Sequence, residues 1–339
     1  MSAQRQTGQG PRQNWLRREW RLLVGLTLSA LCLYLALRGI SLAALQEALA
    51  TARWDRVAAA VGLVLAGTFL KAWRWRALFY PQTIGYAHAW AIFVIGQMLN
   101  AVLPARAGEI GRIYLLGEVE TVSRARVLST VIVEKMVDLV MLALSYLLVA
   151  LWLPKTPLGL PEWLRQAGAG LVPLVVLAIA GLLLFAYAGR PLWRFFQRLL
   201  NPLSLPWQSR AERAMGQALT GFESLRHWQV GLQVWSASLL VWLLSALTNL
   251  WLFRAFGLDL PASVALFLLV VLMIGVSVPP LPGNLGVFPY LCQITLSLLG
   301  TSREAALIYG LALQVTIYLP LIIVGALCLI GGGWSLRRR

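Results

Sequence analysis

The sequence predicts an all-α polytopic membrane protein, and three observations lead to this fold class. Of 339 residues, 59% are hydrophobic and only 12% are charged, and the mean hydropathy of +0.73 is too high for a soluble domain of this length. Several apolar runs approach the ~20 residues that a helix needs to span a bilayer. Two Pro- and Gly-containing segments interrupt such runs and resemble each other. We expect about eight transmembrane helices and two oppositely oriented, re-entrant hairpins.

The apolar runs divide the chain into two membrane halves. The first half occupies 22–188 and the second 230–332, with a basic connector at 189–229 and basic tails at 1–21 and 333–339. The first tail resembles the start of a signal peptide, but no small-residue cleavage site follows, so we expect an uncleaved first span. The expected spans lie near 22–38, 57–72, 87–103, 127–153, 169–188, 230–253, 263–278 and 305–332, and shorter apolar pieces lie at 109–117 and 286–300.

The two interrupting segments, 103–111 and 278–286, share the pattern [Leu/Val]-Pro-x-x-x-Gly-x-[Ile/Leu]-Gly. Proline removes a backbone donor and glycine permits tight or left-handed backbone, so Pro104, Pro279 and Pro282 are expected to shape hairpin tips. A matched pair of broken apolar segments in the two halves of a membrane protein indicates a transport site.

Basic residues indicate the orientation of the chain. They gather in the N-terminal tail, after the second expected span, in the connector and at the C-terminus. By the positive-inside rule, all four clusters and both termini are expected to face the cytoplasm. The hairpin at 87–122 then opens toward the cytoplasm and the one at 263–300 toward the opposite face, which predicts an inverted repeat. The segment Trp73-Arg74-Trp75-Arg76 is interpreted as a set of interfacial anchors.

The residues after each tip suit an anionic headgroup. A short half-helix is expected to begin there, and amides at a helix N-terminus bind anions such as phosphate. The candidate residues for a lipid headgroup site are Gly108, Gly111, Gly283, Asn284 and Gly286. Tight helix packing through small residues is the alternative role of these glycines.

Ionisable residues at membrane depth are costly and indicate function. Arg106 and Arg112 suit a lipid phosphate, because guanidinium binds phosphate with two hydrogen bonds, and Glu109 can pair with either arginine. Glu134 and Asp138 share one helix face and need a cation. Three roles remain open for Glu109, Glu134 and Asp138: gating as partners of the arginines, proton or cation coupling, or, for the last two, a hydrated helix end. A closed ion-pair cluster that only locks the hairpin is the structural alternative.

The remaining composition excludes several protein classes. The net charge of +16 lies at the ends of apolar runs, where arginines meet headgroups, so we expect no nucleic-acid partner. Cys32, Cys292 and Cys328 lie inside apolar runs without metal spacing, and we expect neither a metal site nor a cofactor. No catalytic motif occurs, and the protein is not expected to be an enzyme.

The motif Asn100-x-x-Leu-Pro-x-Arg-x-Gly-Glu-x-x-Arg112, followed by Glu134-x-x-x-Asp138, resembles the lysylphosphatidylglycerol synthase transmembrane-region family. This family includes the flippase-like domain of multiple peptide resistance factors and stand-alone members. The segment 282–288 resembles the family's Pro-Gly-x-x-Gly-x-x-Glu, although Pro289 stands where the family often has Glu. The resemblance implies lipid movement or lipid binding. No aminoacyltransferase domain follows in this chain, so lysyl-lipid synthesis is not expected.

Three functions follow from these observations. The first is a flippase that moves an anionic or phosphate-bearing lipid between leaflets of the inner membrane. The second is a membrane enzyme, or a subunit of one, that acts on a lipid-linked substrate. The third is a lipid-binding scaffold for a separate synthase. The expected partners are a membrane lipid and, as further candidates, a lipid-modifying enzyme and a second copy of the chain.

Overall fold

The computed structural model describes residues 42–103, 107–120, 122–152, 162–199, 205–277 and 286–331. These residues form helices and turns, and no strand occurs among them. The predicted all-α class is therefore confirmed for the described part of the chain. The expected first span, residues 104–106 of the first hairpin tip and residues 278–285 of the second lie outside the described residues.

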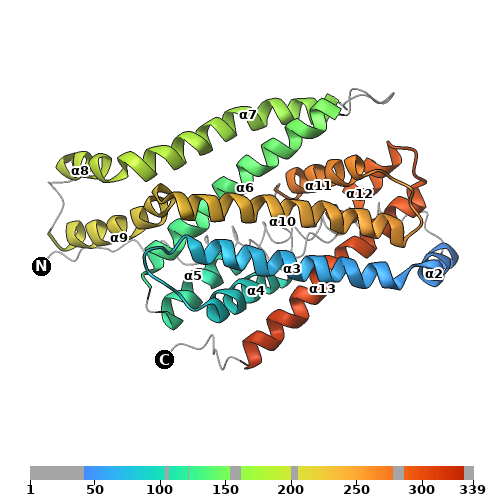
Figure 1. Cartoon of the computed structure of the whole chain (residues 1–339), viewed down its shortest axis with the longest axis horizontal. Helices are drawn as coiled ribbons and strands as arrows, with labels where there is room; N and C mark the ends of the chain where they lie inside the picture. Colours follow the sequence, from blue (N-terminus) through green and yellow to red (C-terminus); the bar gives the residue numbers. More distant parts are fainter. Residues whose placement is uncertain are drawn as a thin grey trace, which may run out of the picture.

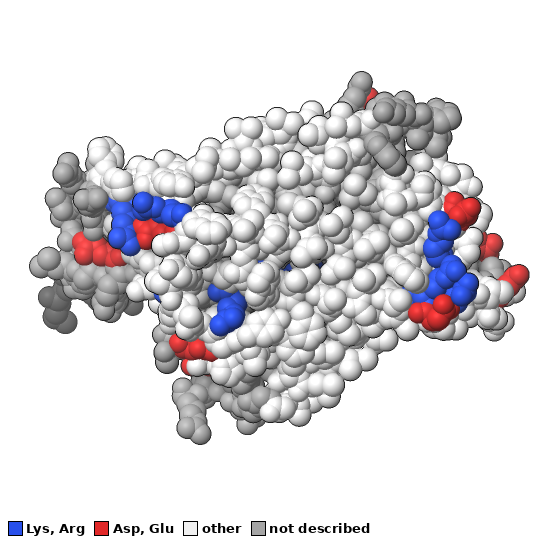
Figure 2. Space-filling model, viewed as in Figure 1, with Lys and Arg blue, Asp and Glu red and all other residues white. Residues whose placement is uncertain are grey.

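Within the described residues, four helical segments are long and apolar enough to cross a membrane: α3 (Trp54–Ala77), Ala169–Trp193, α10 (Trp228–Ala255) and α13 (Arg303–Gly331). A fifth long helix, α6 (Arg124–Trp152), has the length of α13 but carries several charged residues. The charged residues visible in Figure 2 gather mainly at the two ends of the molecule. The chain is therefore a multi-pass membrane protein.

The helices follow the predicted apolar runs within a few residues. α10 covers the predicted 230–253 and α13 the predicted 305–332. α3 is longer than the predicted 57–72 and continues through the segment 73–76, which had been assigned to the membrane interface. This extension places Arg74 and Trp75 inside the helix bundle.

Helices α3 and α10 run side by side in opposite directions through the middle of the molecule (Figure 1). At one end, the Arg53 amide donates to the carbonyl of Ala255 at 2.9 Å. At the other end, the rings of Tyr80 and His227 pack edge to face, with centroids 4.5 Å apart. The pair is therefore held at both ends.

Two helix pairs flank this central pair. α4 (Tyr86–Val102) packs on α5 (Ala107–Val119), and α11 (Ala262–Ser277) packs on α12 (Val287–Ser297). In Figure 1, the first pair lies toward the end that holds α9 (Leu205–Glu223), and the second lies toward the end that holds α2 (Leu42–Thr51). α6 contacts α5 and α11, whereas α13 contacts α12 and α4.

The predicted basic connector is helical where it is described. α7 (Glu162–Leu183) continues through a π-helical turn (Leu184–Ala188) into α8 (Gly189–Leu199). α9 (Leu205–Glu223) packs on α6 and ends in a 3₁₀ turn (Ser224–Arg226). Arg190 Nη2 lies 2.7 Å from Glu223 Oε2, so an exposed ion pair joins α8 to α9.

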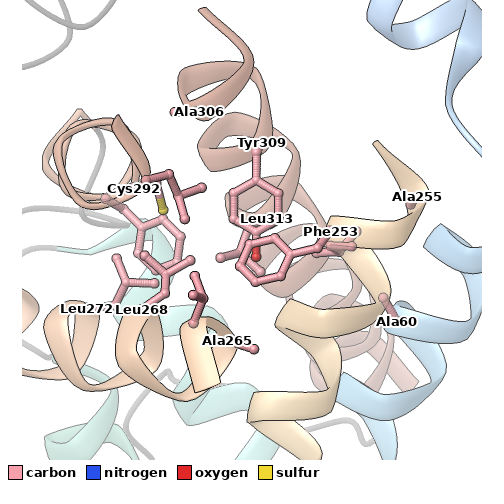
Figure 3. Close-up of a cluster of buried hydrophobic side chains, with 14 residues drawn as sticks. Ala60, Phe253, Ala255, Ala265, Leu268, Leu272, Cys292, Ala306, Tyr309 and Leu313 are labelled. Carbon is pink, nitrogen blue, oxygen red and sulfur yellow. The ribbon is translucent and has the colours of Figure 1, made fainter. Parts of the chain in front are cut away.

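A buried apolar cluster holds the second half together. Phe253, Leu268, Cys292 and Leu313 meet between α10, α11, α12 and α13 (Figure 3). Tyr309 lies in the same cluster, and its hydroxyl lies 3.3 Å from Oδ1 of Asn249. Among the described residues, the buried charged side chains (Arg74, Arg112, Arg126 and Glu134) all belong to the first half. The described core of the second half is therefore apolar and hydrogen-bonded, unlike that of the first half.

Close backbone contact joins α4 to α5. A Cβ added to Gly108 would overlap the carbonyl oxygen of Gly96, and one added to Gly96 would lie 2.6 Å from Cγ of Arg112. A Cβ on Gly111 would lie 2.8 Å from Cδ1 of Leu99. Gly108 and Gly111 therefore serve tight helix packing, the alternative role considered for them.

We expect Gly108→Ala to destabilise the protein by about 1–3 kcal/mol, because the new methyl group would push α5 away from α4. Gly62→Ala on α3 is the matched control, since an added Cβ there meets nothing within 4 Å. Thermal unfolding of the purified variants in detergent measures the difference. Equal melting temperatures for the two variants would contradict the close contact.

Candidate functional site

The centre of the first half is an ion pair between two helices. The guanidinium of Arg112 on α5 contacts both carboxylate oxygens of Glu134 on α6, with Nη2–Oε2 at 2.7 Å and Nη1–Oε1 at 3.4 Å. The side chains are 5% and 4% exposed. A buried pair with two contacts fixes both the distance and the orientation of the helices that carry it.

Arg74 extends the ion pair to two further helices. Its Nη1 atom lies 2.6 Å from Oδ1 of Asp138 and donates to Oγ of Ser238 on α10 at 2.9 Å. Its Nη2 atom lies 3.7 Å from Oε1 of Glu134. Arg74 is 1% exposed, so its assignment to an interfacial anchor was wrong. The cation that Glu134 and Asp138 require comes from Arg74 on α3 as well as from Arg112.

Two aromatic rings enclose the Arg112 guanidinium. Its central carbon lies 4.1 Å from the ring centroid of Trp75 and 4.3 Å from that of Phe93. The indole of Trp75 is fully buried and donates to Oγ1 of Thr130 at 3.0 Å. Cation–π contacts stabilise a desolvated guanidinium, so Arg112 is held by charge and by ring faces together. Trp75 is therefore part of the site and not an interfacial anchor.

Glu109 does not pair with Arg112. Its carboxylate lies 2.8 Å from Nζ of Lys135 on α6, and the two side chains are 23% and 44% exposed. Lys71 lies close enough to interact electrostatically with Glu134 and Asp138. Among the residues described, the ion pairs of the cluster join three cations (Arg74, Arg112 and Lys135) to three carboxylates (Glu109, Glu134 and Asp138).

The cluster keeps hydrogen-bond donors that are not satisfied within the described residues. The Nε atoms of Arg74 and Arg112 are buried and have no hydrogen-bond partner there. A buried donor without a partner costs about 1–3 kcal/mol, and a phosphate oxygen is a strong acceptor for guanidinium. These two unsatisfied guanidinium donors favour an anion over a cation as the ligand.

The structure limits the role predicted for the first-tip amides. The Gly108 amide donates to Oδ1 of Asn100 at 2.8 Å and is not free to bind an anion. At the second tip, Gly286 has a positive φ of 84° and directly precedes α12. Pro289, at the position of the family's Glu, is buried and its backbone packs against Gly310 of α13. The predicted site residues that lie outside the described residues are Pro104, Arg106, Pro279, Pro282, Gly283 and Asn284.

Sequence reasoning missed Lys71 and Arg74 as members of the site. Both lie at the end of an apolar run, where the positive-inside rule assigns basic residues to the cytoplasm. Their spacing of three residues places them on one helix face, and this pattern could have indicated a shared buried role. No group of three or more His, Cys, Asp or Glu residues that could hold a metal ion occurs in the described ranges.

Comparison with known proteins identifies the family. The model described as the lysylphosphatidylglycerol synthase TM region matches residues 22–325. The chain belongs to this family. A curated relative, the UPF0104 membrane protein of Methanothermobacter thermautotrophicus, is 22% identical over 267 residues, which cover 74% of this chain and 77% of that protein. No solved structure matches the chain significantly. The family resemblance inferred from the two motifs is therefore confirmed.

We expect Arg112→Met to destabilise the folded protein by about 3–5 kcal/mol, because Glu134 would lose its principal partner while remaining buried. Arg124→Met is the control: its side chain is 56% exposed and its ion pair with Glu118 is 4.0 Å long, so its loss should cost less than about 1 kcal/mol. Melting temperatures in detergent report both effects. If Arg112→Met and the wild type had the same melting temperature, the buried ion pair would not stabilise the fold.

Proposed function

We propose that the protein moves an anionic or phosphate-bearing lipid between the two leaflets of the cytoplasmic (inner) membrane. Membership in a family whose membrane domain is often linked to lipid flippase activity supports this function. The observation that carries it is the cluster around Arg74, Arg112 and Glu134, which places buried guanidinium donors inside an apolar helix bundle. Ionisable groups at such a position mark the path of a polar substrate.

The helix contacts support an inverted repeat as the framework for transport. Each half contributes a long helix, a helix pair and a closing helix, in the order α3, α4, α5, α6 and then α10, α11, α12, α13. If α3, α4, α5 and α6 are matched in order with α10, α11, α12 and α13, the helix contacts also match. The contact α3–α4 corresponds to α10–α11, α5–α6 to α12–α13, and α4–α13 to α11–α6. Because α3 and α10 run in opposite directions, such a repeat has its halves inverted.

Alternating access then occurs around the two hairpin tips, as in transporters with broken helices near the bilayer midplane. Arg112 and Arg74 hold the headgroup phosphate, with Arg106 as a further candidate. Glu134 and Asp138 form ion pairs with the two arginines when no lipid is bound. A carboxylate that leaves its guanidinium as phosphate arrives exchanges one anion for another, so the arginines are paired before and after binding.

Reconstitution into liposomes tests this function. We expect the purified protein to exchange fluorescently labelled phosphatidylglycerol between leaflets, measured by chemical quenching of the label in the outer leaflet. Lipid extracted after the assay should be chemically unchanged by mass spectrometry. A covalently modified lipid would indicate the enzyme alternative, and absence of exchange would indicate a scaffold that only binds lipid.

Arg112→Lys separates headgroup binding from folding, because it preserves the charge near Glu134 and removes the two-point geometry of guanidinium. We expect exchange to fall roughly tenfold or more, as for loss of one charge-assisted hydrogen bond of about 1.5–3 kcal/mol. The matched control, Arg124→Lys, changes an exposed arginine of the adjoining helix end and should exchange lipid at the wild-type rate. Equal lipid exchange rates for the two variants would show that Arg112 does not bind the headgroup.

A further inference from the structure

Two ion pairs of opposite polarity cross the interface between α5 and α6. The inner pair joins Arg112 of α5 to Glu134 of α6, and the outer pair joins Glu109 of α5 to Lys135 of α6. Glu134 and Lys135 are consecutive residues of α6, and the first is buried whereas the second is partly exposed. The outer pair, with side chains 23% and 44% exposed, therefore lies next to the buried pair in both helices and reaches the surface of the bundle.

The surface around the outer pair is apolar. On α5, Ile110 and Tyr114 are 56% and 50% exposed, and on α6, Leu128 and Ile132 are 46% and 42% exposed. In a membrane protein such side chains face lipid chains. Lys135 continues the exposed stripe of α6 at helical spacing, and its side chain is 44% exposed. An ion pair thus lies on a face that otherwise suits hydrocarbon.

The outer pair also lies deep in the membrane. Lys135 is about 16 Å further along α6 than Arg124, at 1.5 Å per residue. Arg124 begins α6, and its guanidinium stacks on Tyr114 at 4.4 Å, where an aromatic ring and an arginine are typical of the membrane interface. Along α5, Glu109 is about 8 Å from Tyr114 by the same rise, so the pair is expected about 8–16 Å inside that interface, within the ~30 Å hydrocarbon core. A charged pair exposed at this depth is costly unless a polar group reaches it.

We propose that the seam between α5 and α6 is the lateral doorway through which a lipid headgroup reaches the buried cluster, and that the Glu109–Lys135 ion pair is its latch. This inference rests on the proposed function and names its route of entry. The headgroup enters from the leaflet that contains Arg124, while its acyl chains remain against Ile110 and Ile132.

Entry proceeds as an exchange of anions. The headgroup phosphate first replaces Glu109 on Lys135, and then replaces Glu134 on Arg112. Lys135 lies close enough to Glu134 to interact with it electrostatically, so the two exchange steps are adjacent. Lys135 and Arg112 therefore each keep an anionic partner during the two exchange steps.

A reversible cross-link tests the doorway. Glu109→Cys and Lys135→Cys are combined in a background that carries Cys32→Ser and Cys328→Ser; Cys292 is fully buried and is kept. A short bifunctional methanethiosulfonate joins the two cysteines in liposomes that contain labelled phosphatidylglycerol. Because the variant lacks the Lys135 cation, we expect it to exchange lipid more slowly than the wild type before cross-linking. The cross-link should slow this remaining exchange roughly tenfold or more, and reduction should restore the rate seen before cross-linking, as expected for a locked gate.

The matched control places the same cross-linker between Trp73→Cys of α3 and Gln233→Cys of α10, where Gln233 Nε2 lies 3.5 Å from the Trp73 carbonyl. This cross-link should leave exchange unchanged. Unchanged exchange after cross-linking α5 to α6, equal inhibition by both cross-links, or no exchange before cross-linking would each overturn the doorway. Failure of the wild-type protein to exchange phosphatidylglycerol would instead overturn the proposed function.

Charge variants test the latch itself. Glu109→Gln removes the attraction with little change of shape, and we expect exchange to become about two- to fivefold faster, the effect of losing a partly exposed ion pair. Slower or unchanged exchange in Glu109→Gln would contradict a latch.

Discussion

The buried network of Arg74, Arg112 and Glu134 is the constraint on which the first membrane half depends. A charge inside an apolar bundle is stable only if its partners are in place, because water cannot replace them. The network draws on α3, α5 and α6 and reaches Ser238 of α10. It therefore fixes the position of α5, a helix too short to be held by spanning the membrane itself.

The glycines and the ion network act at the same place. Gly96 has no side chain where the stem of Arg112 passes, and its carbonyl contacts Gly108 one turn before Arg112 on α5. A larger residue at position 96 would displace the arginine and separate α4 from α5. The small residues between α4 and α5 thus set where Arg112 meets Glu134, so helix packing and the ion pair depend on the same contacts.

Much of the fold followed from the sequence, because apolar periodicity and length determine where membrane helices form. The positions of α10 and α13 were predicted within a few residues, and the family was identified from two motifs. Arg112 and Glu134 were predicted as members of one cluster, since an acid and a base at membrane depth require each other.

The partners inside the cluster were not predictable from spacing along one helix. Glu109 is three residues from Arg112, but Lys135 of another helix is its partner. Arg74 was assigned to the interface because the positive-inside rule uses only the position of a basic residue along the chain. The rule does not tell which face of a helix is buried. The Gly108 amide was assigned to a ligand because Asn100, its partner, belongs to the preceding helix. Contacts between helices decided all three cases.

The contacts of the closing helices have a consequence for how the molecule can move. α13 belongs to the second half but packs on α4 of the first, where Gly325 lies against Met98 and the carbonyl of Val94. α6 belongs to the first half but packs on α11 of the second. The core of each half is completed by a helix from the other half, so we do not expect the two halves to move as separate rigid bodies. A movement of α4 must therefore shift α13, and a movement of α11 must shift α6. Because α13 and α6 each belong to the opposite half, a movement in one half is transmitted to the other.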